Sequence, residues 1–123
     1  MQHILAIDQG TTGTTVLVLD EQLNIVGRGY QEFAQIYPKP GWVEHCPKAI
    51  LASVSTAIDS ALGDSQIAVN GLATIGITNQ RETVVLWDKR TGEPVHNAIV
   101  WQDRRTSDTC AAMIEAGEQH EGR

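Results

Sequence analysis

The chain has 123 residues, 41% of them hydrophobic, and this length suits one domain with a modest core but not two. Its formal net charge of -6 at pH 7 argues against binding to nucleic acid or to an anionic membrane, because such binding needs clustered Lys and Arg. The apolar stretch before Asp8 is too short for a signal peptide or a membrane span, so we expect a cytoplasmic protein with no membrane span and with Cys46 and Cys110 as free thiols.

Short apolar runs predict three strands at the start of the chain, over residues 3–8, 14–20 and 25–33. A Gly- and Thr-rich turn separates the first two strands, and the polar segment 21–24 separates the second from the third. Connections this short predict an antiparallel three-strand meander.

A helix is predicted after an irregular stretch. Residues 35–46 include two prolines and a glycine and are not expected to be regular. Pro47 suits the first turn of a helix, and Gly63 followed by an Asp suits its end. The apolar residues that keep a 3.6-residue period, and that we expect in the core, are Ile50, Leu51, Val54, Ala57, Ile58, Ala61 and Leu62.

The second half of the chain predicts further strands and a C-terminal helix. A buried strand is expected over 72–78, another strand over 83–88, a turn over 89–92 and a strand over 98–101. The helix is expected over about 106–116. Together with the meander and the first helix, this order of elements predicts an α/β fold.

The turn between the first two strands favours a phosphate site. Gly10 and Gly13 allow backbone N–H groups to approach an anion closely, and the hydroxyls of Thr11 and Thr12 can add hydrogen bonds. Asp8, at the end of the first strand, is suited to holding hydrated Mg²⁺. Because Gly and Thr are also ordinary hairpin residues, this segment alone is equally compatible with a plain turn.

Three further segments carry a family resemblance. They read Gly41-Trp42-Val43-Glu44-His45, Gly76-Ile77-Thr78-Asn79-Gln80-Arg81-Glu82-Thr83 and Ile99-Val100-Trp101-Gln102-Asp103-Arg104-Arg105. With the phosphate turn, they closely resemble the start of the glycerol kinases, members of a carbohydrate kinase family whose two domains share the actin-like (ribonuclease H-like) ATPase fold. The resemblance implies that residues 1–123 are the N-terminal part of the first domain, with the rest of that domain and the second domain absent.

The resemblance implies that Arg81, Glu82 and Trp101 bind glycerol. A carboxylate can accept hydrogen bonds from a polyol, a guanidinium can donate them, and an indole offers a flat apolar face to the carbon chain. An Arg beside a Glu is otherwise usually a solvated pair, and most tryptophans belong to the core. The charged residues 103–105 are expected to have structural roles. Trp42, Glu44 and His45 are expected to position their loop rather than to act in catalysis.

The reaction implied by the resemblance is transfer of the γ-phosphoryl group of Mg·ATP to glycerol, which gives glycerol 3-phosphate and ADP. The catalytic base is expected beyond residue 123, so we expect an N-terminal fragment that is inactive alone, from a full-length form that is a homo-oligomer. Two alternatives stay open: a kinase for another sugar or polyol of the same family, and a non-catalytic truncated interaction module.

The chain departs from the family pattern at two positions. The family's turn typically reads Asp-x-Gly-Thr-Thr-Ser-x-Arg, and Thr15 stands where the arginine is expected. The missing cation predicts weaker nucleotide affinity or compensation by another cation, because charge-assisted contacts are the stronger ones. Cys46 stands where an Asp usually caps the helix, and a thiol is a poorer acceptor, which should cost about 1 kcal/mol of local stability.

Overall fold

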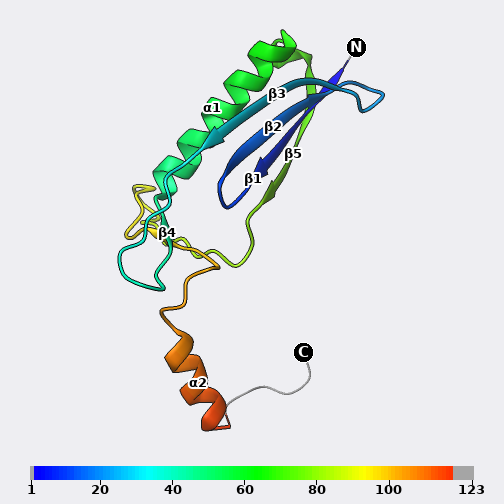
Figure 1. The fold of residues 1–123 in the computed structure, drawn as a ribbon. Helices are drawn as coiled ribbons and strands as arrows, with labels where there is room; N and C mark the ends of the chain where they lie inside the picture. Colours follow the sequence, from blue (N-terminus) through cyan, green and yellow to red (C-terminus); the bar gives the residue numbers. More distant parts are fainter. Residues whose placement is uncertain (1, 118–123) are drawn as a thin grey trace.

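The computed structural model describes residues 2–117, and its centre is a four-stranded sheet (Figure 1). The strands are β1 (His3–Gln9), β2 (Gly13–Leu19), β3 (Ile25–Glu32) and β5 (Leu72–Asn79), in the spatial order β3-β2-β1-β5. The first three form the predicted antiparallel meander, and β5 pairs in parallel with β1. The α/β fold class and the meander are therefore confirmed.

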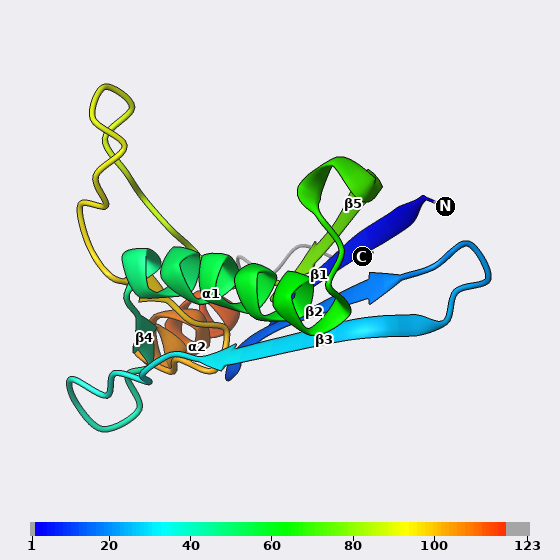
Figure 2. The same ribbon diagram turned by 90° about the horizontal axis from the view of Figure 1, so that it is seen from above.

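Helix α1 (Pro47–Ser65) packs on one face of the sheet, over β2 and β3 (Figures 1 and 2). The core between them consists of Leu5, Ile7, Val16, Val18, Ala57 and Ala61. Two glycines of β3 allow the close approach of the helix, because a Cβ atom at Gly27 or Gly29 would overlap the α1 backbone. The helix and the sheet therefore meet backbone to backbone near β3.

Two details of α1 differ from the prediction. The helix does not end at Gly63 but continues to Ser65, and Gln66 adopts the left-handed conformation (φ 58°) that ends it. The helical period predicts Leu51 in the core, yet this residue is 69% exposed. The buried face holds Ser53 instead, whose hydroxyl forms a 2.7 Å hydrogen bond with the hydroxyl of Thr14 on β2.

The cysteines behave as predicted. Both Cys46 and Cys110 are free thiols. Cys46 is the N-cap residue of α1, and its side chain makes no capping hydrogen bond.

The segments that flank the sheet are less regular than predicted. A small second sheet pairs β4 (Glu44–His45) with β6 (Ala98–Ile99), so the stretch 35–46 is not wholly irregular, and the strand expected over 98–101 shortens to two residues. No strand forms over 83–88, where only two isolated bridges occur, so that prediction is wrong. The segment projects from the sheet and turns back at 89–92, as expected (Figure 2).

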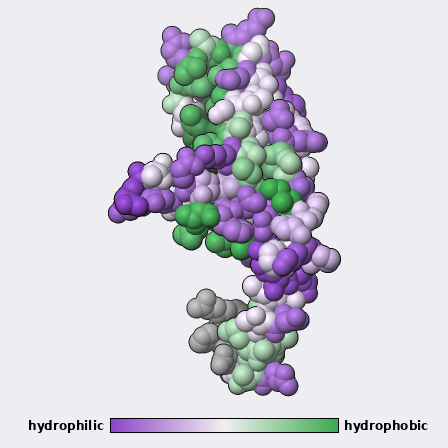
Figure 3. All heavy atoms as spheres, turned by 90° about the vertical axis from the view of Figure 1, so that its left-hand side faces the viewer, coloured by the Kyte–Doolittle hydropathy of each residue, from purple (hydrophilic) through white to green (hydrophobic). Residues whose placement is uncertain are grey.

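Strand β5 forms where predicted, but it is not buried. Ile75 is 54% exposed and Ile77 is 73% exposed, because β5 lies at the edge of the sheet and α1 covers β2 and β3 instead. Other hydrophobic side chains are exposed as well, and Figure 3 shows several such areas on one face of the molecule.

The remaining elements are helical. A short 3₁₀ helix, η1 (Val69–Gly71), precedes β5, and helix α2 (Ser107–Glu115) confirms the helix predicted over 106–116. No helix within residues 2–117 combines the length and the apolar character needed to cross a bilayer.

Candidate functional site

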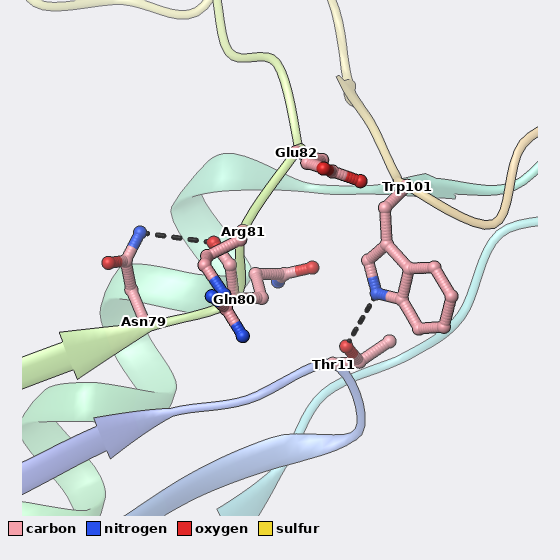
Figure 4. A pocket seen from close by; sticks show the side chains of 6 residues that line it. All are labelled: Thr11, Asn79, Gln80, Arg81, Glu82 and Trp101. Carbon is pink, nitrogen blue, oxygen red and sulfur yellow. Dashed lines mark hydrogen bonds between the residues drawn. The ribbon is translucent and has the colours of Figure 1, made fainter. Parts of the chain in front are cut away.

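An open pocket of about 590 Å³ lies where β1 and β5 end (Figure 4). Because these two strands are parallel neighbours, their carboxyl ends and the loops that follow meet at one edge of the sheet, where α/β sheets commonly bind ligands. The residues that line the pocket are Thr11, Asn79, Gln80, Arg81, Glu82 and Trp101.

The three residues predicted to bind substrate meet in this pocket. Arg81 and Glu82 follow β5 and are exposed to solvent, and the Glu82 carboxylate points toward Trp101 (Figure 4). Glu82 has φ 59°, a left-handed conformation that is uncommon outside glycine and asparagine and that often marks functional sites. Trp101 is 51% exposed, and its Nε1–H donates a 2.9 Å hydrogen bond to the Thr11 hydroxyl.

The predicted phosphate turn forms the neighbouring wall of the pocket. Its ends are joined by a hydrogen bond of 2.9 Å from the Gly10 N–H to the Gly13 carbonyl. The Gly10 N–H is therefore already engaged within the turn, so an anion would have to bind the other hydrogen-bond donors of the turn. Thr11 lines the pocket, whereas Thr12 is exposed outside it and Gly13 is buried at the start of β2.

Two glutamines hold the backbone of this turn, and a histidine joins them. Gln35 Nε2 donates to the Thr11 carbonyl at 3.0 Å, and Gln80 Nε2 lies 3.4 Å from the Gly10 carbonyl. His45 lies between them, with Nε2 at 2.6 Å from Gln35 Oε1 and Nδ1 at 3.3 Å from Gln80 Nε2. Because an amide nitrogen only donates, this arrangement requires a neutral His45 that carries its proton on Nε2.

His45 is completely buried, and this burial lowers the pKa of its imidazole below the usual value of 6.5. The Phe33 ring packs edge-on against it, with ring centroids 4.8 Å apart. Sequence reasoning predicts only a loop-positioning role for this residue. The sequence gives little sign of its link to the phosphate turn, because the two glutamines lie 10 and 35 residues away in the chain.

An ion-pair network supports the segment that carries Trp101. Arg105 donates to both oxygens of Asp103, at 2.9 and 2.7 Å, and to Glu44 at 2.8 Å. Its guanidinium also lies 3.8 Å from the centre of the Trp42 ring. The hydrogen bonds from Arg105 lower the pKa of Asp103 to about 2 and lower the pKa of Glu44 as well. These contacts agree with the structural role expected for residues 103–105.

Asp8, the predicted Mg²⁺ ligand, is exposed at the end of β1 and lies opposite Thr15 of β2. Mg²⁺ commonly keeps several waters and binds one or two carboxylates together with substrate phosphates. A single exposed carboxylate beside a phosphate turn fits that preference. Within residues 2–117, no group of three His, Cys, Asp or Glu side chains gathers as a closed metal site.

The chain is similar to known proteins in sequence and in fold. Residues 3–123 match the model of the FGGY family of carbohydrate kinases, N-terminal domain. The chain is 53% identical over 118 residues to a glycerol kinase of Xanthomonas axonopodis pv. citri (strain 306), an alignment that covers 96% of this chain and 24% of that protein. The chain thus spans about a quarter of the length of such curated relatives.

Solved structures show the same fold. The crystal structure of Plasmodium falciparum glycerol kinase with ADP superposes with a TM-score of 0.81 at 37% identity, covering 98% of this chain and 24% of that one. The ligand-bound xylulose kinase from Lactobacillus acidophilus gives a TM-score of 0.86 at 23% identity, covering 95% of this chain and 23% of that one. The second likeness shows the fold alone.

Proposed function

This chain belongs to the FGGY family of carbohydrate kinases, and on that premise we propose that it is the N-terminal part of a glycerol kinase. The proposed reaction transfers the γ-phosphoryl group of Mg·ATP to a terminal hydroxyl of glycerol, which gives glycerol 3-phosphate and ADP. The observation that carries the proposal is the pocket in which Arg81, Glu82 and Trp101 meet Thr11 of the phosphate turn. Because the reaction draws on ATP, we also propose a cytoplasmic location.

The pocket has the chemistry that a small polyol needs. The Glu82 carboxylate accepts hydrogen bonds from hydroxyl groups, and the Arg81 guanidinium donates to their oxygens. The Trp101 ring, held by its hydrogen bond to Thr11, offers an apolar face to the carbon chain. A longer sugar would require further polar partners. The identity of 53% to a glycerol kinase favours glycerol over the sugars of other family members.

The turn of residues 10–13 would hold the phosphates of the nucleotide. Thr11 and Thr12 supply hydroxyl groups, and Gly10, which has no side chain, leaves room for the anion at the start of the turn. Gly13 is buried and closes the turn by accepting the Gly10 N–H. Asp8 would bind hydrated Mg²⁺, and the bound ion would neutralise part of the negative charge of the phosphates. We assign no residue of this chain as the base that takes the proton of the glycerol hydroxyl, and we expect that base beyond residue 123.

The first test is formation of glycerol 3-phosphate from Mg·ATP and glycerol by the protein at its full natural length. We expect Glu82→Ala to raise the KM for glycerol at least about tenfold, since a hydrogen bond to a charged group is typically worth about 1.5–3 kcal/mol. Glu115→Ala, on α2 and outside the pocket, is the matched control and should leave KM unchanged. The 123-residue chain alone should show no turnover.

Two results would contradict the proposal. Preference for a pentulose over glycerol in a panel of acceptors would show that the protein is a sugar kinase of the same family rather than a glycerol kinase. Phosphorylation of no acceptor by the full-length protein would favour the interaction-module alternative.

A further inference from the structure

The sheet face that α1 leaves open carries a row of three polar residues. Asp8 of β1 lies opposite Thr15 of β2, and Thr15 lies opposite Tyr30 of β3. Residues that are directly opposite in antiparallel strands share a face of the sheet. Because Leu5 and Ile7 of β1 face the core under α1, the alternating residue Asp8 and its row lie on the other face.

Tyr30, at the end of this row, leans toward the phosphate turn. A Cβ atom at Gly13 would lie 2.7 Å from the Tyr30 hydroxyl oxygen and 2.9 Å from Cε2. The phenol ring therefore rests against Gly13, the last residue of the turn. The ring covers Gly13, which is buried, while Tyr30 itself remains 50% exposed.

Gly13 is what makes this position of the tyrosine possible. Any side chain at residue 13 would collide with the Tyr30 ring and also with the Gln31 carbonyl, 2.7 Å from the added Cβ. Gly13 and Thr15, where the family pattern has an arginine, thus lie close together at one end of β2. Thr15 stands in place of a cation, and Gly13 leaves the space that the neighbouring phenol occupies.

The single cation of β3, Arg28, does not explain how the site compensates for Thr15. Arg28 shares the open face, but it lies opposite Leu17, two residues farther from the turn than Tyr30. The Tyr30 hydroxyl lies beside Gly13 of the turn, and a phenol can donate one hydrogen bond to a phosphate oxygen.

We infer that the Tyr30 hydroxyl donates a hydrogen bond to the polyphosphate of the nucleotide at the turn of residues 10–13. This inference rests on the proposed function, because that function places the nucleotide phosphates at this turn. Tyr30 is then a nucleotide-binding residue supplied by β3. On this face of the sheet, the neutral Tyr30 hydroxyl would contact the phosphates in place of the arginine that the family pattern has on β2.

The test is the affinity of the full natural-length protein for Mg·ADP and for adenosine, measured by calorimetry. Tyr30→Phe removes only the hydroxyl and keeps the ring against Gly13. It should weaken Mg·ADP binding at least about tenfold and leave adenosine binding unchanged. Tyr37→Phe, at a tyrosine that is 67% exposed in another loop, is the matched control and should change neither affinity.

Each other outcome has a distinct meaning. An unchanged Mg·ADP affinity in Tyr30→Phe, with binding by the wild type, would overturn the role of Tyr30 and leave the proposed function standing. Equal losses for Mg·ADP and adenosine would show damage to the fold and would also overturn it. Absence of Mg·ADP binding by the wild type would refute the proposed function, and the inference with it.

A double variant tests whether an arginine on β2 can replace the Tyr30 hydroxyl of β3 as the phosphate-binding group. Adding Thr15→Arg to Tyr30→Phe should restore Mg·ADP affinity, because the guanidinium would return to the middle of the same row. A double variant as weak as Tyr30→Phe alone would show that the two positions do not serve the same phosphate group, and it would overturn the inference.

Discussion

Replacing His45 by a phenylalanine should loosen the phosphate turn while keeping an aromatic ring in the core. The substitution preserves the contact with Phe33 but removes both ring nitrogens. Gln35 Oε1 then loses its partner at 2.6 Å, and Gln80 Nε2 loses its contact at 3.3 Å. Both glutamines also hold the backbone of the turn, so the substitution acts on the turn through them.

The cost can be estimated from these contacts. Gln35 is half-buried, so leaving its Oε1 without a partner should cost an amount near the lower end of the about 1–3 kcal/mol typical of a buried acceptor. Gln80 loses little, because its Nε2 keeps contacts of 3.4 Å to the Gly10 carbonyl and to Gln9 Oε1. We therefore expect His45→Phe to lower the free energy of unfolding by about 1 kcal/mol near pH 8.

The cost should depend on pH. Burial lowers the pKa of His45 below 6.5 in the folded state, whereas the unfolded chain titrates near 6.5. Above that pH both states are neutral, and the titration contributes nothing. As the pH falls below 6.5 toward the lowered folded pKa, only the unfolded state gains a proton, so the wild type loses stability. The phenyl ring of the variant cannot titrate, and the difference in stability between variant and wild type should shrink on acidification.

The assay is urea unfolding of the domain at pH 8 and pH 5.5, followed by tryptophan fluorescence. His96→Phe, at an exposed position, is the control and should change stability little. The affinity for Mg·ADP should fall in His45→Phe, because the turn is less well held. A cost below about 0.5 kcal/mol at pH 8 would refute the estimate for the Gln35 acceptor. An equal cost at both pH values would refute a neutral, buried His45.

Two further predictions concern stability. Gly29→Ala should destabilise the domain by about 1–3 kcal/mol, because the added Cβ would collide with the Ala57 carbonyl of α1. Gly63→Ala has open space around its Cβ and should stabilise the domain by up to about 1 kcal/mol. Denaturant titration measures both changes. Arg105 lowers the pKa of Asp103 in the folded state to about 2, from an ordinary value of 3.8. The ionised Asp103 therefore stabilises the fold fully above pH 3.8, and this stabilisation is lost as the pH falls from 3.8 toward 2. Acid unfolding should show a smaller change over that range in Asp103→Asn, and an unchanged profile would contradict the pairing.

The elements that the sequence predicted well are those with a regular pattern and a covered face. Strands β1 to β3 alternate or run apolar between clear turns, and α1 keeps its helical period. The expected strand over 83–88 has β-forming residues, but Val84 and Leu86 are 65% exposed and the segment finds only isolated bridges. Strand propensity without a neighbouring strand does not make a sheet.

The site was predictable only in part. Arg81, Glu82 and Trp101 stand in motifs, and the structure brings them together in one pocket. The supporting contacts of Gln35 and His45 were not predictable, because they depend on distances between loops that a single sequence does not reveal. The approach of Tyr30 to Gly13 likewise appears only when β2 and β3 are placed side by side.

The proposed glycerol and phosphate sites share one residue. The Thr11 hydroxyl accepts from the Trp101 indole, and the Thr11 carbonyl accepts from Gln35, so contacts from both sides meet at the middle of the turn. A polyol bound against Trp101 and a phosphate bound at the turn would therefore both contact the same short segment. Phosphoryl transfer depends on positioning and electrostatic stabilisation more than on covalent chemistry by the protein. A turn held by side chains from separate loops supplies that positioning, since acceptor and donor would be aligned against one fixed residue.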